Sequence, residues 1–181
     1  MSGEKPKDGV LKYTLGILIC TLLRLLPRLP NMEPIMATSM AYSKGYGWLK
    51  GAVFSMAAIV GYDLVTGTQG MWTLVTAPTY GLVAAGAYLY LRDKPNKTRH
   101  YLAYSIAATL FYDIVTGIGM GYIVFKMPLM MVVYGQIPFT LMHLSSSMLT
   151  ALFAPSIYKW IVTNPDVSLE KIISRHVNIT G

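Results

Sequence analysis

Nine polar and aromatic side chains that could contact a small molecule are expected at one level, the outer third of the membrane. They are Asn31, Glu33, Tyr62, Asp63, Trp72, Tyr80, Tyr112, Asp113 and Gln136. A concave site with apolar walls and a few convergent polar groups is typical of small-molecule binding. Two alternatives to a binding site remain. The aromatic rings also suit a belt at a membrane surface, and the carboxylates could simply fix helix packing.

Catalytic and metal-binding motifs were sought among the same residue types. The sequence has three histidines, His100, His143 and His176, and one cysteine, Cys20, and none of them has the spacing of a metal site. His143 is followed closely by the serines 145–147, but no nucleophile elbow and no nearby carboxylate accompany them. We therefore expect no enzyme activity, no metal and no cofactor.

The amino-acid composition indicates that the apolar segments lie in a membrane. Of the 181 residues, 54% are apolar and 13% are charged, against about 45–50% and about 25% in soluble domains. The 15 Lys and Arg residues lie in small groups between apolar segments, which disfavours nucleic acid as a partner. The sequence predicts one all-α integral membrane domain over residues 1–181, with spans at about 10–27, 34–43, 48–66, 71–91, 100–118 and 137–161.

Basic residues between the segments predict the topology. The loop 92–99 carries four Lys and Arg residues and should face the cytoplasm. Lys12 and Lys44 should lie on the same side, so either the short segment 34–43 crosses or segment 10–27 does not, and the first option is preferred. An uncleaved first span is favoured over a signal peptide because Arg24 follows it in place of a small-residue cleavage site.

The basic residues after the last span should also be cytoplasmic. Segment 119–135 therefore should not cross, and we expect it to fold back as a loop or half-helix. Six spans result, with both termini and the tail 162–181 in the cytoplasm. Loops 28–34 and 119–135 would then cap an outward-facing pocket. A seven-span alternative, with 119–135 as a helix, would export the C-terminal basic residues.

An internal repeat relates the middle of the chain to itself at an offset of fifty residues. SMAAIVGYDLVTG (55–67) and SIAATLFYDIVTG (105–117) agree at eight of thirteen positions. Each unit should be a helix, an outer loop and a returning helix. Asp63 and Asp113 then lie about one turn before the outer ends of their helices, and each carboxylate should face protein or water rather than lipid.

The residues at 24–37 (RLLPRLPNMEPIMA), 61–92, 111–125 and 135–155 resemble a substrate-binding S component of an energy-coupling factor transporter. The resemblance implies a six-helix protein in the plasma membrane of a prokaryote that binds a vitamin, a vitamin precursor or a metal ion from outside. A transmembrane coupling subunit and two cytoplasmic ATPases would supply the energy. It also implies a site in the first outer loop and at the outer helix ends, matching Asn31, Glu33, Trp72, Tyr80, Asp113, Gln136 and His143.

The family often docks its coupling subunit through an AxxxA motif on the first span. Here that span offers only Gly16 and Cys20 at this spacing, and Ala37 with Ala41 on the second span is a substitute. Such small residues can also serve internal helix packing and not docking of a partner.

Two other functional classes remain open at the level of the sequence. A self-sufficient secondary transporter or channel would need an ionisable relay near the bilayer midplane. The charges considered above are instead expected in the outer third of the membrane. A structural or assembly subunit would use its polar groups only to bond one another.

Overall fold

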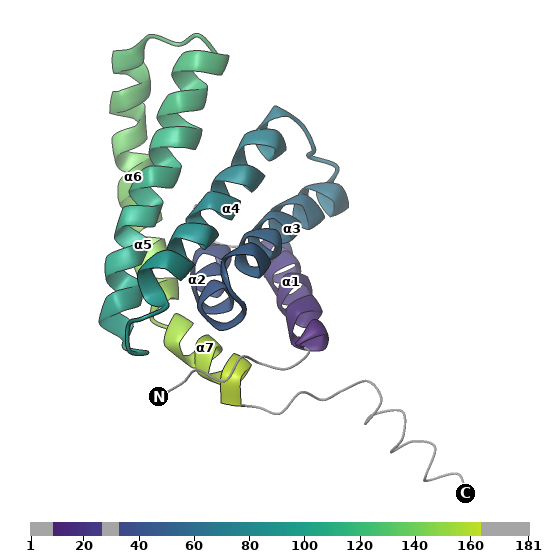
Figure 1. Cartoon of the computed structure of the whole chain (residues 1–181). Helices are drawn as coiled ribbons and strands as arrows, with labels where there is room; N and C mark the ends of the chain where they lie inside the picture. The colour runs from purple at the N-terminus through teal and green to yellow at the C-terminus, as the bar shows by residue number, and fades with distance from the viewer. Residues whose placement is uncertain (1–8, 27–32, 164–181) are drawn as a thin grey trace, which may run out of the picture.

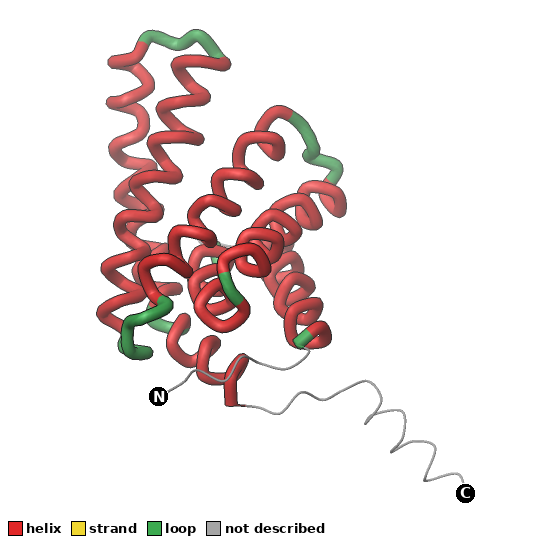
Figure 2. The backbone as a smooth tube through the Cα atoms, viewed as in Figure 1, coloured by secondary structure: helices red, strands yellow, loops and turns green. Residues whose placement is uncertain are grey.

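The chain folds into a bundle of helices (Figures 1 and 2). The computed structural model describes residues 9–26 and 33–163, and no strand occurs in these ranges. The helices are α1 (Val10–Leu25), α2 (Ile35–Tyr46), α3 (Trp48–Thr66), α4 (Met71–Leu91), α5 (Thr98–Asp113), the π-helix η1 (Ile114–Val124), α6 (Leu129–Ala151) and α7 (Ala154–Thr163).

Four helical segments are long and apolar enough to cross a membrane. They are Trp48–Thr66, Met71–Leu91, Thr98–Val124 and Leu129–Thr163, among the described residues. The prediction of an all-helical protein with transmembrane helices is confirmed at this level. Helix α1 has 16 residues and α2 has 12, fewer than the about 20 that span a hydrocarbon core.

Two helical hairpins dominate the bundle, as the sequence repeat predicts. Helices α3 and α4 form the first, and α5 with η1 and α6 form the second; their tips point the same way in Figure 1. The first arm of hairpin one ends at Gly67, which adopts φ 70° and donates its N–H to the carbonyl of Asp63. Glycine is the residue that adopts this left-handed conformation without a steric penalty.

The second hairpin corrects the expectation for residues 119–135. They form neither a lid nor a half-helix: η1 continues the helix to Val124, a turn follows, and α6 begins at Leu129. The expected span 137–161 therefore starts earlier, and its helix is interrupted between Ala151 and Ala154. Glycine in an apolar membrane helix does not break it when neighbouring helices pack closely. A Cβ at Gly121 would lie 2.7 Å from the Val132 side chain of the returning helix.

Helix α2 forms the centre of the bundle, although it is the shortest of the segments expected to cross. It contacts α1, α3, α4, α5, α6 and α7. Tyr42 stacks on Phe54 with ring centroids 4.0 Å apart and donates its hydroxyl to the carbonyl of Lys12. Gly16 lies beneath this hydroxyl, where a Cβ would collide with it.

Basic residues from distant parts of the chain meet at the end of the bundle where α7 lies, which we call the basic end. Lys44 Nζ donates to the carbonyl of Lys94 at 2.6 Å, and Lys12 Nζ donates to the carbonyl of Ile161 at 3.0 Å. The hairpin tips lie at the opposite end (Figure 1). The residues that the sequence assigns to one side of the membrane thus share one end of the molecule. The predicted tail 162–181 lies almost wholly outside the described residues.

Candidate functional site

Most of the candidate binding residues join one continuous series of contacts, which we call the polar chain. Its members come from α1, the segment before α2, α3, α4, α5 and α6. They are Arg24, Glu33, Tyr62, Tyr80, Tyr112, Asp113, Gln136, Thr140 and His143.

One end of the polar chain is an ion pair between Arg24 and Glu33. Arg24 Nη2 lies 3.1 Å from Glu33 Oε1, and the guanidinium carbon lies 4.2 Å from the centroid of the Tyr62 ring. Tyr80 donates its hydroxyl to the other carboxylate oxygen at 2.9 Å. Arg24 occupies the last turn of α1, where a cation interacts favourably with the helix dipole.

The guanidinium group of Arg24 is only partly satisfied. Its side chain is 10% exposed. Nε and Nη1 are buried, and neither has a hydrogen-bond acceptor among the described residues. A buried donor without a partner costs about 1–3 kcal/mol, and more when the group is charged. This end of the polar chain therefore has two donors available for an additional acceptor.

Two tyrosines connect the ends of the polar chain. The rings of Tyr80 on α4 and Tyr112 on α5 have centroids 4.6 Å apart at 48°. The rings of Tyr112 and His143 meet edge to face, with centroids 5.6 Å apart and an interplanar angle of 81°. These contacts join the α3–α4 hairpin to the α5–α6 hairpin through aromatic rings.

The other end of the polar chain is a buried Asp113–His143 pair. Asp113 and His143 have side chains only 2% and 3% exposed, and His143 Nδ1 lies 2.7 Å from Asp113 Oδ1. The second oxygen accepts the Thr140 hydroxyl at 2.7 Å, and Gln136 donates to Thr140 at 3.2 Å. The spacing 136, 140, 143 places the three side chains on one face of α6.

The carboxylate decides which nitrogen of His143 carries a proton. An ionised carboxylate only accepts hydrogen bonds, so Nδ1 must be the donor. In the neutral ring, Nε2 is then a lone-pair acceptor, and in the protonated ring it is a donor. It is buried and has no partner within residues 9–26 and 33–163. The two ends of the polar chain thus hold unused groups, two donors at Arg24 and one ring nitrogen at His143.

The Asp113–His143 pair lies farther from the hairpin tip than the sequence predicts. Asp63 does lie in the last turn of α3, but η1 adds 11 residues beyond Asp113. Asp113 is therefore in the middle part of the Thr98–Val124 helix and not one turn from its end. The expectation that this carboxylate sits near the hairpin tip is wrong. The cause is that Gly117 packs under the side chain of Gln136, where a Cβ would collide with it, and does not terminate the helix.

Of the nine predicted binding residues that the structure describes, two stand apart from the polar chain. Asp63 accepts the hydroxyls of Thr73 and Thr68 and thereby joins the two arms of the first hairpin at its tip. Trp72 packs its ring against Phe125 with centroids 6.0 Å apart, across the two hairpin tips. Asn31 lies outside the described residues.

Sequence reasoning missed two members of the polar chain, Arg24 and Thr140. Arg24 was interpreted only as a topology marker. The signal that could have identified it is its position inside the apolar run TLLRLL, because a charge within an apolar segment needs a partner. Thr140 lies one turn before His143 and carries no signal of its own.

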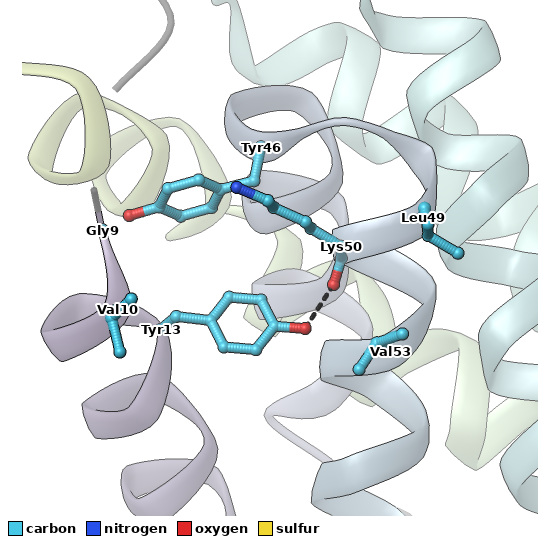
Figure 3. Close-up of a pocket in the computed structure, with 7 residues that line it drawn as sticks. All are labelled: Gly9, Val10, Tyr13, Tyr46, Leu49, Lys50 and Val53. Carbon is cyan, nitrogen blue, oxygen red and sulfur yellow. Dashed lines mark hydrogen bonds between the residues drawn. The ribbon is translucent and has the colours of Figure 1, made fainter. Parts of the chain in front are cut away.

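Two cavities lie away from the polar chain and share no lining residue with it. The first, of about 330 Å³, lies at the basic end (Figure 3). The second, of about 370 Å³, is an apolar groove between α1, α2 and the α6–α7 junction. Three of the expected docking residues, Gly16, Cys20 and Ala37, line this groove and Ala41 does not; all four are buried.

A comparison of the chain with protein-family models, with curated proteins and with solved structures gives no match. Among the described residues, no three His, Cys, Asp or Glu side chains are grouped so that they could hold a metal ion.

Proposed function

We propose that this protein is the substrate-binding subunit of an ATP-driven uptake transporter for a vitamin or vitamin precursor, and that the polar chain binds the substrate. One observation carries the proposal. Arg24 and His143 are both buried, both lie on the polar chain, and both keep hydrogen-bonding atoms without a partner. Unsatisfied buried atoms in a native protein call for a specific explanation, and an absent ligand provides one.

The chemistry of the two ends defines the class of substrate. A planar guanidinium fork suits a carboxylate or carbonyl oxygen, so the Arg24 end should take an acceptor group. His143 Nε2 should accept an N–H or O–H from the substrate. The rings of Tyr80 and Tyr112 between these ends suit a flat ring by offset or edge contact. A flat heterocycle with an acidic or carbonyl group at one end and a donor at the other meets all three requirements.

The resemblance to S components of energy-coupling factor transporters suggests which subunit performs each step of transport. The sequence has no phosphate-binding loop, so nucleotide hydrolysis would belong to the two ATPase subunits. The coupling subunit would dock along the groove that Gly16, Cys20 and Ala37 line, because small side chains allow a partner helix to approach closely. The basic end would face the cytoplasm, and the hairpin tips would face outward.

A second candidate function has one specific observation in its favour. Asp113 and His143 form a buried ionisable pair in the middle part of a membrane-spanning helix, and such pairs serve as proton relays in secondary transporters. A self-sufficient proton-coupled transporter would accumulate its substrate in proteoliposomes under a pH gradient without any ATPase. The S-component proposal predicts binding but no such accumulation.

The test is ligand binding by the purified full-length chain. A panel of vitamins and precursors is added, and thermal unfolding in detergent is followed. A substrate at 100 times its Kd should stabilise the native state by about 2.7 kcal/mol. Arg24→Gln and His143→Gln should each abolish the shift.

Arg92→Gln is the matched control because Arg92 is exposed and, among the described residues, forms an ion pair only with its neighbour Asp93. It should leave the shift unchanged. A panel without any hit, together with no small molecule released from the purified protein, would count against the proposal.

A further inference from the structure

A second binding site is formed at the basic end of the molecule, in the cavity of about 330 Å³ shown in Figure 3. It lies where the start of α1 faces the junction of α2 and α3. Its lining residues are Gly9, Val10, Tyr13, Tyr46, Leu49, Lys50 and Val53. None of them belongs to the polar chain, so this site is independent of the proposed transport function.

The walls of the cavity are held in place by protein contacts. Tyr13 donates its hydroxyl to the carbonyl of Lys50 at 2.6 Å, which ties α1 to α3 (Figure 3). The rings of Tyr13 and Tyr46 meet edge to face, 6.1 Å apart at 83°. Gly9 allows the chain to pass beside Tyr46, because a Cβ there would collide with the phenol. The site is thus preformed in the protein.

The ammonium group of Lys50 lies at the cavity and differs from those of Lys12 and Lys44 in its contacts. Lys12 and Lys44 each donate to a backbone carbonyl. In the part of the chain that the structure describes, the Lys50 ammonium group has no hydrogen-bond acceptor and lies 5.9 Å from the centroid of the Tyr46 ring. Figure 3 shows its nitrogen directed along the cavity toward that ring. A cation in this position can bind an anionic group that enters the cavity.

The remaining lining is apolar and exposed. Val10, Leu49 and Val53 have side chains that are 72%, 57% and 49% exposed. Trp48, beside the cavity in sequence, is 54% exposed. A cluster of Tyr, Trp and Lys next to exposed aliphatic side chains is typical of the level where phospholipid headgroups meet acyl chains. The cavity therefore combines a site for a negative charge with a site for hydrocarbon.

We propose that this cavity binds an anionic phospholipid. Lys50 donates to the headgroup phosphate, and Val10, Leu49 and Val53 contact the first carbons of an acyl chain. An anionic lipid fits better than a zwitterionic one because the whole end of the bundle is basic, and positive side chains near a membrane surface attract anionic lipids. A soluble phosphate would use the cation but leave the apolar side of the cavity uncovered.

The test measures lipid retained by the full-length protein, by native mass spectrometry after exchange into detergent with added phosphatidylglycerol or phosphatidylcholine. The wild type should retain phosphatidylglycerol in preference. Lys50→Gln should weaken retention about fivefold, the loss expected for one lysine at an anionic surface. Val53→Ser should also weaken it, because the acyl contact is lost. Lys97→Gln, in the loop before α5 and outside the cavity, should leave retention unchanged.

Three results would overturn the proposal. One is equal retention of the two lipids by the wild type. Another is the same loss in Lys97→Gln as in Lys50→Gln, which would indicate general electrostatic attraction. The last is displacement of the lipid by millimolar inorganic phosphate, which would indicate a site for phosphate alone. Circular dichroism that matches the wild type shows that each variant is folded.

Discussion

Replacing Asp113 with asparagine should destabilise the protein far more than the same replacement at Asp63, its counterpart in the repeat. Both aspartates occupy the same position in the sequence YD-x-VTG and both accept a threonine hydroxyl from the returning helix. Asp113 is 2% exposed and also accepts from His143, whereas Asp63 lies near the hairpin tip and is half-buried. The two variants therefore compare a buried carboxylate that is paired with a histidine and a half-buried one that is bonded only to threonine hydroxyls among the described residues.

The magnitude follows from the hydrogen bonds of each carboxylate. A hydrogen bond to a charged group contributes about 1.5–3 kcal/mol, and a buried donor left without a partner costs about 1–3 kcal/mol. Asparagine keeps one acceptor oxygen, so Asp113→Asn loses one of two such bonds and turns an amide N–H₂ toward a donor. We expect a loss of about 2–4 kcal/mol at Asp113 and less than about 1 kcal/mol at Asp63.

Thermal unfolding in detergent measures both losses. For a chain of this size, each kcal/mol shifts Tm by about 2–4 °C, so the two variants should differ by roughly 5–10 °C. A double-mutant cycle with His143→Gln should give a coupling energy above about 1.5 kcal/mol, because neutral hydrogen bonds between membrane helices average about 0.6 kcal/mol. Equal Tm values for the two aspartate variants, or a coupling near the neutral average, would refute the account of Asp113.

The remaining predictions concern helix contact, the Arg24 end and topology. Gly121→Ala should destabilise the second hairpin by about 1–3 kcal/mol, because its Cβ would lie 2.7 Å from the short, branched side chain of Val132, whereas Gly135→Ala, with open space around it, should have no unfavourable effect on Tm. Tyr80→Phe should cost about 1–2 kcal/mol, since it removes the hydroxyl donated to a buried carboxylate; an unchanged Tm would contradict this. Lys97→Cys should react with a membrane-impermeant maleimide only in opened cells, and labelling of intact cells would reverse the proposed orientation.

The repeat made the pair of hairpins predictable, but not the difference between them. The segments 55–67 and 105–117 end in the same VTG residues. Gly67 terminates α3 in a left-handed conformation, while Gly117 lies within η1. Local sequence cannot distinguish these outcomes, because Gly117 is kept helical by the returning helix that packs against it. Because η1 continues the helix beyond Asp113, the predicted position of Asp113, one turn from the outer end of its helix, is wrong.

Seven of the ten candidate binding residues lie in the polar chain, because polar groups inside apolar helices must face one another rather than lipid. Arg24 was missed for a physical reason. A basic residue after an apolar run can mark a membrane boundary or fill a buried ion pair, and only the positions of Glu33 and Tyr62 decide between them. Helix α2 was similarly ambiguous: its apolar residues suit a membrane span, but here they pack against the surrounding helices.

The most direct test of the central claim is native mass spectrometry of the full-length protein purified gently from its own membrane. The account predicts one non-covalent adduct with the mass of a small organic molecule, present in the wild type and absent from Arg24→Gln and His143→Gln, with lipid adducts unaffected by either change. If the same adduct persists in both variants, the polar chain is not where the molecule binds, and the account is contradicted.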